Sequence, residues 1–252
     1  MQETHSNART RNLILAIDRF AAWTAAHWLA LFIALYGAWV LAPFLAPFFA
    51  RAGATPFADA TYGMYSFFCH QLPQRSLFLF GDKPMYSLDE IKSVWNLDGF
   101  DGLRQFNGNA QFGWKIAWSD RMISFYGSIW LGALLFALAR GRLKPITFTG
   151  WVFLGMLPVG LDGFTHFLND ILAGTSGAGF RDTNAWLAAL TANALPASFY
   201  AGDALGSFNS NARWITGILF GVTTVWFLFP FVDEAMRDLA RQANAQLQRA
   251  RA

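Results

Sequence analysis

The longest uncharged stretch of the sequence constrains the fold most strongly. Residues 20–50 contain no charged side chain over 31 positions, and a helix needs about 20 apolar residues to cross a bilayer. The run is longer than the roughly 7–15 residues of a signal-peptide core, and residues 1–11 lack a cleavage pattern. We therefore predict a retained membrane span at about 21–45, which Pro43 and Pro47 should kink or end.

Three more apolar segments predict further spans at about 122–139, 146–168 and 213–232. Only 14% of the residues are charged, whereas soluble domains carry about 25%. The uncharged segment 185–202 is interrupted by Pro196, so a re-entrant or surface helix is favoured there and a fifth span stays open. The expected fold class is all-α: one polytopic membrane domain over 1–252, a helix bundle with about four transmembrane helices.

Lys and Arg gather in three short segments beside the predicted spans, and they indicate the orientation of the chain. These residues are Arg9, Arg11 and Arg19, then Arg140, Arg142 and Lys144, then Arg237, Arg241, Arg249 and Arg251. Because such residues favour cytoplasmic flanks, we expect a multi-pass cell-membrane protein with both termini in the cytoplasm. The basic residues are too dispersed to indicate nucleic-acid binding.

The same orientation places segments 51–120 and 170–212 outside, as an extracytoplasmic cap, and 233–252 inside as a polar, partly helical tail. Ser87 and Glu90 form a capping-box pattern, which predicts a short helix at about 88–95. Residues 96–113 are rich in Gly, Asn and Asp and predict turns. Residues 60–74 favour an interfacial or half-inserted helix, so the cap should be helical and irregular.

Four polar clusters that are distant in sequence are expected at the outer rim of this bundle. One is the segment 69–76, which holds the only cysteine. Another is formed by Asp162, Thr165, His166 and Asn169, whose spacing puts them on one helix face. The ligand-binding candidates drawn from all four clusters are His70, Arg75, Asp120, Arg121, Tyr126, Thr165, Asn211 and Arg213.

Ionisable groups at membrane depth are costly and usually face the bundle interior or a watery cavity. Two interpretations of these clusters stay open. In the first, they line a functional pocket, in which Asp162 orients His166 as a general acid or base and favours its protonated form. In the second, Asp and Arg side chains simply pair at the helix ends, with Arg213 a candidate partner of Asp162.

Metal binding is a weaker alternative for the same residues. Cys69, His70 and His166 are types that bind zinc, but adjacent Cys and His side chains do not easily bind one ion, and no CxxC or HExxH spacing is present. We therefore predict no metal site and leave any cofactor unassigned.

The clusters also resemble, in order, four motifs of an uncharacterised membrane family, domain of unknown function 2085. The matching segments are 69–76, 119–127, 162–166 and 209–217. The chain departs from the family pattern at Ser119 and Met122, where many members carry cysteines, and at His166, where Gln is usual. A metal role that paired thiols would serve elsewhere in the family is therefore not expected here, and the resemblance supplies no known activity.

Arginine side chains suit carboxylate and phosphate groups. The leading prediction is therefore that the outer rim binds or processes an anionic lipid or lipid-linked headgroup. In that role Arg75, Arg121 and Arg213 would hold the anion. The alternative is a non-catalytic accessory subunit of a larger membrane complex, in which the aromatic-rich spans and the long outer segments dock partner subunits.

Overall fold

Four helical stretches are long and apolar enough to span a membrane in the computed structural model, which describes residues 2–250, with side chains from residue 9 onward. They run over Arg9–Arg51, Asp120–Ala139, Phe148–Ala173 and Phe208–Arg249. Each stretch overlaps one of the four predicted spans, the third beginning two residues later than predicted, and the predicted all-α class is confirmed. The second stretch is helix α6 (Asp120–Ala139) and the fourth is helix α12 (Phe208–Arg249).

Prolines interrupt the first and third of these stretches. Helix α1 (Gln2–Leu41) gives way to the 3₁₀ turn η1 (Ala42–Leu45) and then to α2 (Ala46–Arg51), as Pro43 and Pro47 predict. The third stretch consists of α7 (Phe148–Trp151), the π-helical turn η3 (Val152–Met156) and α8 (Leu157–Ala173). Pro158 lacks a backbone N–H and crowds the preceding turn, which accounts for the wider turn before it.

Helices α6 and α12 pack together along most of the length of α6, and α1 and α8 contact α12 beside them. Gly217 and Gly221 allow the close approach of α12 to α6, because a Cβ at Gly221 would lie 1.9 Å from the Ser128 Oγ. Towards the far end of the bundle, Trp28 of α1, Phe136 of α6 and Phe229 of α12 share one apolar core.

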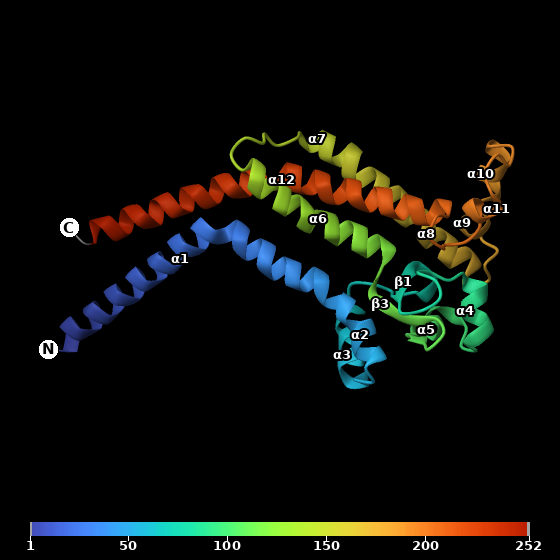
Figure 1. Ribbon diagram of the computed structural model, residues 1–252. Coiled ribbons are helices and arrows are strands. Elements are labelled where there is room, and N and C mark those ends of the chain that lie inside the picture. Colours follow the sequence, from blue (N-terminus) through green and yellow to red (C-terminus); the bar gives the residue numbers. More distant parts are fainter. Residues whose placement is uncertain (1, 251–252) are drawn as a thin grey trace.

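The segments that connect the spans form a cap at one end of the bundle (Figure 1), which we define as residues 52–119 and 174–207. The predicted short helix is present as α4, and its Ser87–Glu90 capping box is formed. Segment 185–202 contains only short helices and is not among the helical stretches long and apolar enough to span a membrane. The helices of the cap are α3 (Thr55–Tyr65), η2 (Pro73–Arg75), α4 (Leu88–Val94), α5 (Gly99–Arg104), α9 (Phe180–Thr183), α10 (Ala185–Leu190) and α11 (Ala197–Tyr200).

The cap also contains a small antiparallel sheet that the sequence analysis missed. Strands β1 (Ser76–Leu79), β2 (Gly108–Asn109) and β3 (Gly113–Ser119) are arranged in the order β1-β3-β2. The predicted turns at 96–113 therefore include α5 and β2. The side chain of Asn109 accepts hydrogen bonds from the backbone of Gln111 and Phe112, which tightens the turn between β2 and β3.

Both described ends of the chain, at residues 2 and 250, lie at the opposite end of the bundle from the cap (Figure 1). Helix α12 continues without a break to Arg249, so the polar tail predicted from residue 233 is a helical extension of the last span. The Nη2 of Arg11 donates to the carbonyl of Ala250, 2.9 Å away, which ties the two ends together. Residues 1, 251 and 252 of the predicted termini lie outside the described residues.

Candidate functional site

The segment 69–76 forms a tight turn that leads from α3 into β1. Gln71 adopts a left-handed backbone conformation (φ 53°), and its side chain donates to the carbonyl of Tyr62. The Nζ of Lys115, a fully buried residue of β3, donates to the carbonyl of Gln71 at 2.9 Å. These contacts fix the turn against the sheet and set the positions of Cys69 and His70.

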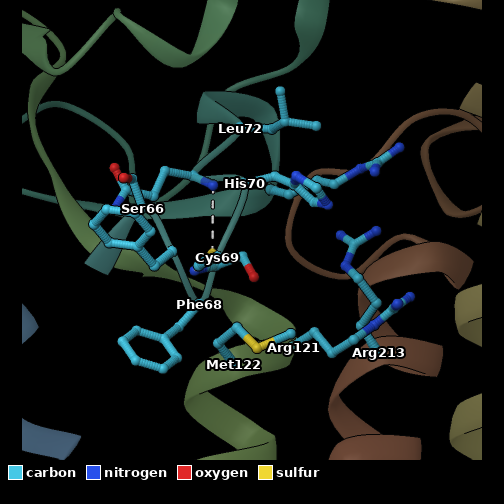
Figure 2. A pocket seen from close by; sticks show the side chains of 12 residues that line it. Ser66, Phe68, Cys69, His70, Leu72, Arg121, Met122 and Arg213 are labelled. Atoms are coloured by element: carbon cyan, nitrogen blue, oxygen red, sulfur yellow. Dashed lines mark hydrogen bonds between the residues drawn. The ribbon is translucent and has the colours of Figure 1, made fainter. Parts of the chain in front are cut away.

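A cavity of about 240 Å³ lies between this turn and the ends of α6 and α12. We call it the arginine cavity, because Arg75, Arg121 and Arg213 line it. Figure 2 shows Arg121 and Arg213 together on one side of the cavity and Phe68 on the other. Its remaining walls are formed by Ser66, Phe67, Cys69, His70, Gln71, Leu72, Ser119 and Met122.

The thiol of Cys69 is largely buried in one wall of the arginine cavity, with 7% of the residue exposed. Its Sγ accepts hydrogen bonds from the backbone N–H groups of Gln71 (3.4 Å) and Ser119 (3.3 Å). His70, the next residue, is exposed. The cysteine therefore links the turn to the residue that precedes α6.

Behind the cavity, Arg213 makes a buried ion-pair network. Its Nε donates to both carboxylate oxygens of Asp120, at 2.8 and 2.9 Å, and its Nη1 donates to Asp203 at 2.6 Å. Arg75 donates to the same Asp203 through Nε and forms a two-bond pair with Asp170 at 2.8 and 2.9 Å. Two arginines, Arg75 and Arg213, thus join several parts of the chain. These are the segment 69–76, the helices α6, α8 and α12, and the residues just before α12.

Asp203, which lies outside the spanning helices, shows how strongly this network favours charge. Burial by itself would raise the pKa of Asp203, but the guanidinium groups of Arg75 and Arg213 outweigh burial and hold the pKa below its ordinary value. The carboxylates Asp203 and Asp170 likewise outweigh burial of Arg75 and raise its pKa. Both groups are therefore charged at neutral pH.

Asp162 belongs to a second group of ion pairs and does not contact Arg213, contrary to the pairing considered above. Its two oxygens accept from Arg121 and Arg181, each at 2.7 Å. Arg213 is instead occupied by Asp120, because α6 and α12 pack directly together, and by Asp203 of the segment that precedes α12.

His166 lies against Arg181, and this contact overturns the expected protonated imidazole. The Nη2 of Arg181 is 2.9 Å from the His166 Nε2, whereas the nearest oxygen of Asp162 is 3.7 Å from it. Because a guanidinium can only donate, Nε2 must accept and the ring is neutral. The Nδ1 of His166 is buried without a hydrogen-bond partner among the described residues.

The arginines and aspartates of these ion pairs are equal in number, but they are separated in space. Arg75, Arg121, Arg181 and Arg213 pair with Asp120, Asp162, Asp170 and Asp203. No Asp or Glu of the described chain lines the arginine cavity. A second cavity of about 410 Å³ behind Arg75 is lined instead by the four carboxylates of Asp89, Asp170, Asp182 and Asp203. The arginine cavity is therefore the cationic side of a neutral network.

The structure brings some of the predicted site residues to the cavity and leaves others away from it. His70, Arg75, Arg121, Arg213 and the weak metal candidate Cys69 line it. The remaining candidates do not: Asp120 lies behind Arg213, Tyr126 packs on Trp39 and Trp118, Thr165 donates to Leu161 and Asp162 of its own helix, and exposed Asn211 donates to Gly206.

The two predicted catalytic residues, Asp162 and His166, are likewise outside the lining of the arginine cavity. Both are buried in α8, where they contact Arg181. Within the described part of the chain, no group of three His, Cys, Asp or Glu side chains is placed to hold one metal ion.

Sequence reasoning missed Asp170, Arg181 and Asp203, which complete the network. Asp170 lies one helical turn beyond His166 on α8, so the pattern that identified Asp162, Thr165, His166 and Asn169 could have included it. Arg181 and Asp203 lie in connecting segments without periodicity. Their places depend on contacts such as the bond from the backbone N–H of Arg181 to the Asn169 Oδ1, at 2.8 Å.

No match to the chain was found among protein-family models, among curated proteins or among solved structures. The resemblance to the domain of unknown function 2085 family therefore stays a prediction.

Proposed function

We propose that the arginine cavity binds the anionic headgroup of a membrane amphiphile. The observation that carries the proposal is the composition of its lining: three arginines and His70, with no carboxylate from the described chain. A cleft lined by one sign of charge raises the local concentration of ligands of the opposite sign. Phosphate and carboxylate groups fit guanidinium donors best.

Arg121 is the residue we expect to contact the headgroup most directly. Its Nη2 donates to Asp162 and its Nε is buried, but its side chain is 17% exposed and its Nη1 makes no hydrogen bond in the described chain. Arg75 and Arg213 each use three nitrogens on Asp170, Asp203 or Asp120. They would supply a fixed positive field, and Arg121 would supply the free donors.

The surroundings of the cavity support a ligand that comes from the bilayer. Phe67 and Phe68 line the cavity and are themselves 87% and 51% exposed. The cavity lies at the cap end of the bundle, where α6 and α12 begin. With the basic flanks in the cytoplasm, this end would face the outer side of the cell membrane, and the ligand would come from the outer leaflet.

We limit the proposal to binding, because His166 and Asp162 do not line the cavity. The four motifs that resemble domain of unknown function 2085 contribute to two groups of ion pairs, through Arg75 and Arg213 in one and Arg121 and Asp162 in the other. This convergence supports our proposal that the chain belongs to that family. Residues of three of these motifs line the arginine cavity, through Arg75, Arg121 and Arg213.

The test uses two soluble short-chain lipids that differ in headgroup. Purified protein is titrated with dihexanoyl phosphatidic acid and with dihexanoyl phosphatidylcholine by isothermal calorimetry. We expect phosphatidic acid to bind more tightly, and Arg121→Gln to weaken its binding at least tenfold, because a charge-assisted contact contributes about 1.5–3 kcal/mol. Asp162 keeps Arg181 in this variant, so folding should persist.

Arg142→Gln is the matched control, since Arg142 is exposed in the connection between α6 and α7, away from the cap. It should bind phosphatidic acid like the unchanged protein. Equal affinity for the two lipids, or unchanged affinity in Arg121→Gln, would contradict the proposal. That result, together with recovery of the chain only in a stoichiometric complex, would favour the accessory-subunit alternative.

A further inference from the structure

A third cavity, of about 310 Å³, adjoins the arginine cavity across the turn of residues 69–76. We call it the side cavity. His70 and Leu72 line both cavities. The ion pair of Arg75 and Asp170 also lies between them, because Arg75 lines the arginine cavity and Asp170 lines the side cavity. The two cavities are thus neighbours with a common wall.

The walls of the side cavity differ in chemistry from those of the arginine cavity. Leu72, Phe100, Phe167 and Ile171 supply apolar surface, and Asp101, Arg104 and Asp170 lie at its polar part. Asp170 is already paired with Arg75, so its carboxylate would repel rather than attract a second anion. This cavity therefore favours an uncharged, apolar group.

Two of its apolar walls come from the face of α8 that the bundle leaves uncovered. Phe167 and Ile171 are 58% and 62% exposed, and Phe164, one turn earlier, is similarly exposed. Helix α8 belongs to a stretch long and apolar enough to span a membrane. The side cavity is therefore continuous with a surface that lipid chains would contact.

We propose that the side cavity holds the hydrocarbon chain of the same amphiphile whose anionic headgroup occupies the arginine cavity. This inference rests on the proposed function and adds the class of ligand: a single-chain or slender amphiphile with a terminal phosphate or carboxylate. The volume lies at the lower end of the roughly 300–1,000 Å³ of small-ligand sites, which suits one chain. His70 and Leu72, in the common wall, would contact the junction of head and chain.

The chain-length dependence of binding tests this inference. Hexyl, octyl and decyl phosphate are titrated by calorimetry into protein held in an amphipathic polymer instead of detergent. Burial of one methylene contributes enough to tighten binding about three- to fourfold. We therefore expect the affinity to rise by roughly tenfold from hexyl to octyl phosphate, and to rise again for decyl phosphate until the cavity is filled.

Ile171→Trp is the decisive variant, because the larger ring occupies the side cavity while position 171 stays exposed enough to accept it. The increase with chain length should disappear, and the three alkyl phosphates should bind with affinities within about twofold of one another. Phe100→Ser removes apolar wall from the other side and should also flatten the increase. Leu172→Trp is the control, since Leu172 is exposed on α8 but does not line the cavity, and it should keep the increase.

The failures of the two proposals are distinguishable. If hexyl phosphate binds, and Arg121→Gln weakens its binding, but both Ile171→Trp and Phe100→Ser keep the full dependence on chain length, the side cavity does not hold the chain. If no alkyl phosphate binds to the unchanged protein, or if Arg121→Gln leaves all affinities unchanged, the headgroup proposal and this inference are both overturned.

Discussion

At the scale of single residues, Arg213 and Asp120 form the most deeply buried ion pair of the cap end, with 2% and 0% of each residue exposed. Ser210 adds a hydroxyl donor to Asp120 at 3.3 Å. Two charges removed from water are stable only when each is fully paired. The pair should therefore be necessary for folding, whatever ligand the adjoining cavity binds.

We predict that Arg213→Ala lowers the free energy of unfolding by about 3–5 kcal/mol, the usual cost of breaking a buried pair. Combining Arg213→Ala with Asp120→Ala should recover part of this loss. The losses caused by Arg213→Ala and Asp162→Ala should instead sum in the double variant to within about 0.5 kcal/mol. Thermal unfolding of the single and double variants in detergent measures both couplings. A large coupling of Arg213 to Asp162, with none to Asp120, would contradict the network.

Lys115 is a second residue whose surroundings make a definite prediction. Burial lowers its pKa to about 7. The Nζ donates to the carbonyls of Gln71 and Arg104, and a neutral amine keeps enough hydrogens for both bonds. The unfolded chain therefore binds more protons than the folded one between about pH 7 and the ordinary lysine pKa of about 10.4.

Because the unfolded state binds more protons over that range, the folded state should gain stability as the pH rises above about 7. Lys115→Met should remove this part of the pH dependence, which chemical unfolding at pH 6.5, 8 and 9.5 would show. Lys83→Met, at an exposed lysine of the cap, is the control and should retain the rise. A stability that falls with pH equally in the unchanged protein and in Lys115→Met would refute the prediction.

At the scale of elements, the contact between α6 and α12 depends on small residues. A Cβ at Gly221 would meet the backbone of Ile129 and Phe125 at 2.9 Å, besides the Ser128 hydroxyl. The Ser124 Oγ donates to the carbonyl of Arg213 at 3.1 Å across the same seam. Close packing of two helices at glycine and serine is a common mode of association in membranes.

Gly221→Ala should therefore destabilise the protein by roughly 1–3 kcal/mol, the usual effect of overpacking. Gly127→Ala is the matched control on α6, since a Cβ there meets no atom within 4 Å. It should be neutral or slightly stabilising, because alanine favours a helix over glycine by about 1 kcal/mol. Melting temperatures in one detergent give the comparison, and equal shifts in the two variants would show that the seam is not tightly packed.

The elements that could be predicted from the sequence are those with local signals. Long apolar runs located the spans, Pro43 marked the end of α1, and the Ser87–Glu90 capping box located α4. The sheet was missed because β2 is two residues long and β3 is buried on both faces, so neither shows alternation. Gly113, the first residue of β3, shows why the sheet is hard to predict from the sequence. Its φ is 73° and a Cβ there would lie 2.2 Å from the Leu79 carbonyl oxygen, a constraint that exists only once β1 is in place.

At the scale of the whole molecule, both described chain ends and the α6–α7 connection lie away from the cap (Figure 1). This agrees with an even number of spans. The assignment of the two chain ends to the cytoplasmic side is inferred from the basic residues that flank the spans. We predict that reporter fusions within 141–144 and at the C-terminus report a cytoplasmic location. A reporter inserted after Ser93, exposed in the cap, should report the outside. The reverse pattern would place the arginine cavity in the cytoplasm.

The candidate site could also be predicted only where the sequence carries a local signal. The cavity-lining arginines were predicted because each begins or follows a recognisable segment. Their partners were mispaired, because which carboxylate reaches Arg213 depends on the packing of α6 on α12 and on the position of Asp203 in a connecting segment. The separation of cationic and acidic cavities around Arg75 follows from the tertiary arrangement and has no signature in the sequence.

The central claim, that the arginine cavity attracts anions, can be tested without knowing the ligand, because Cys69 is the only cysteine and lines that cavity. Purified protein is treated with two methanethiosulfonates of similar size, one carrying a sulfonate and one a trimethylammonium group. Each rate is divided by the rate of that reagent with glutathione. The control is Ser93→Cys in a Cys69→Ser background, on the exposed surface of α4.

We predict that the sulfonate reagent modifies Cys69 at least tenfold faster than the trimethylammonium reagent after this correction, as expected for a cleft lined by one sign of charge. The ratio should fall in Arg121→Gln and at high salt, and it should be near one for the thiol introduced by Ser93→Cys in the control. A ratio near one at Cys69, or a preference for the cationic reagent, would contradict the claim that this cavity binds an anionic headgroup.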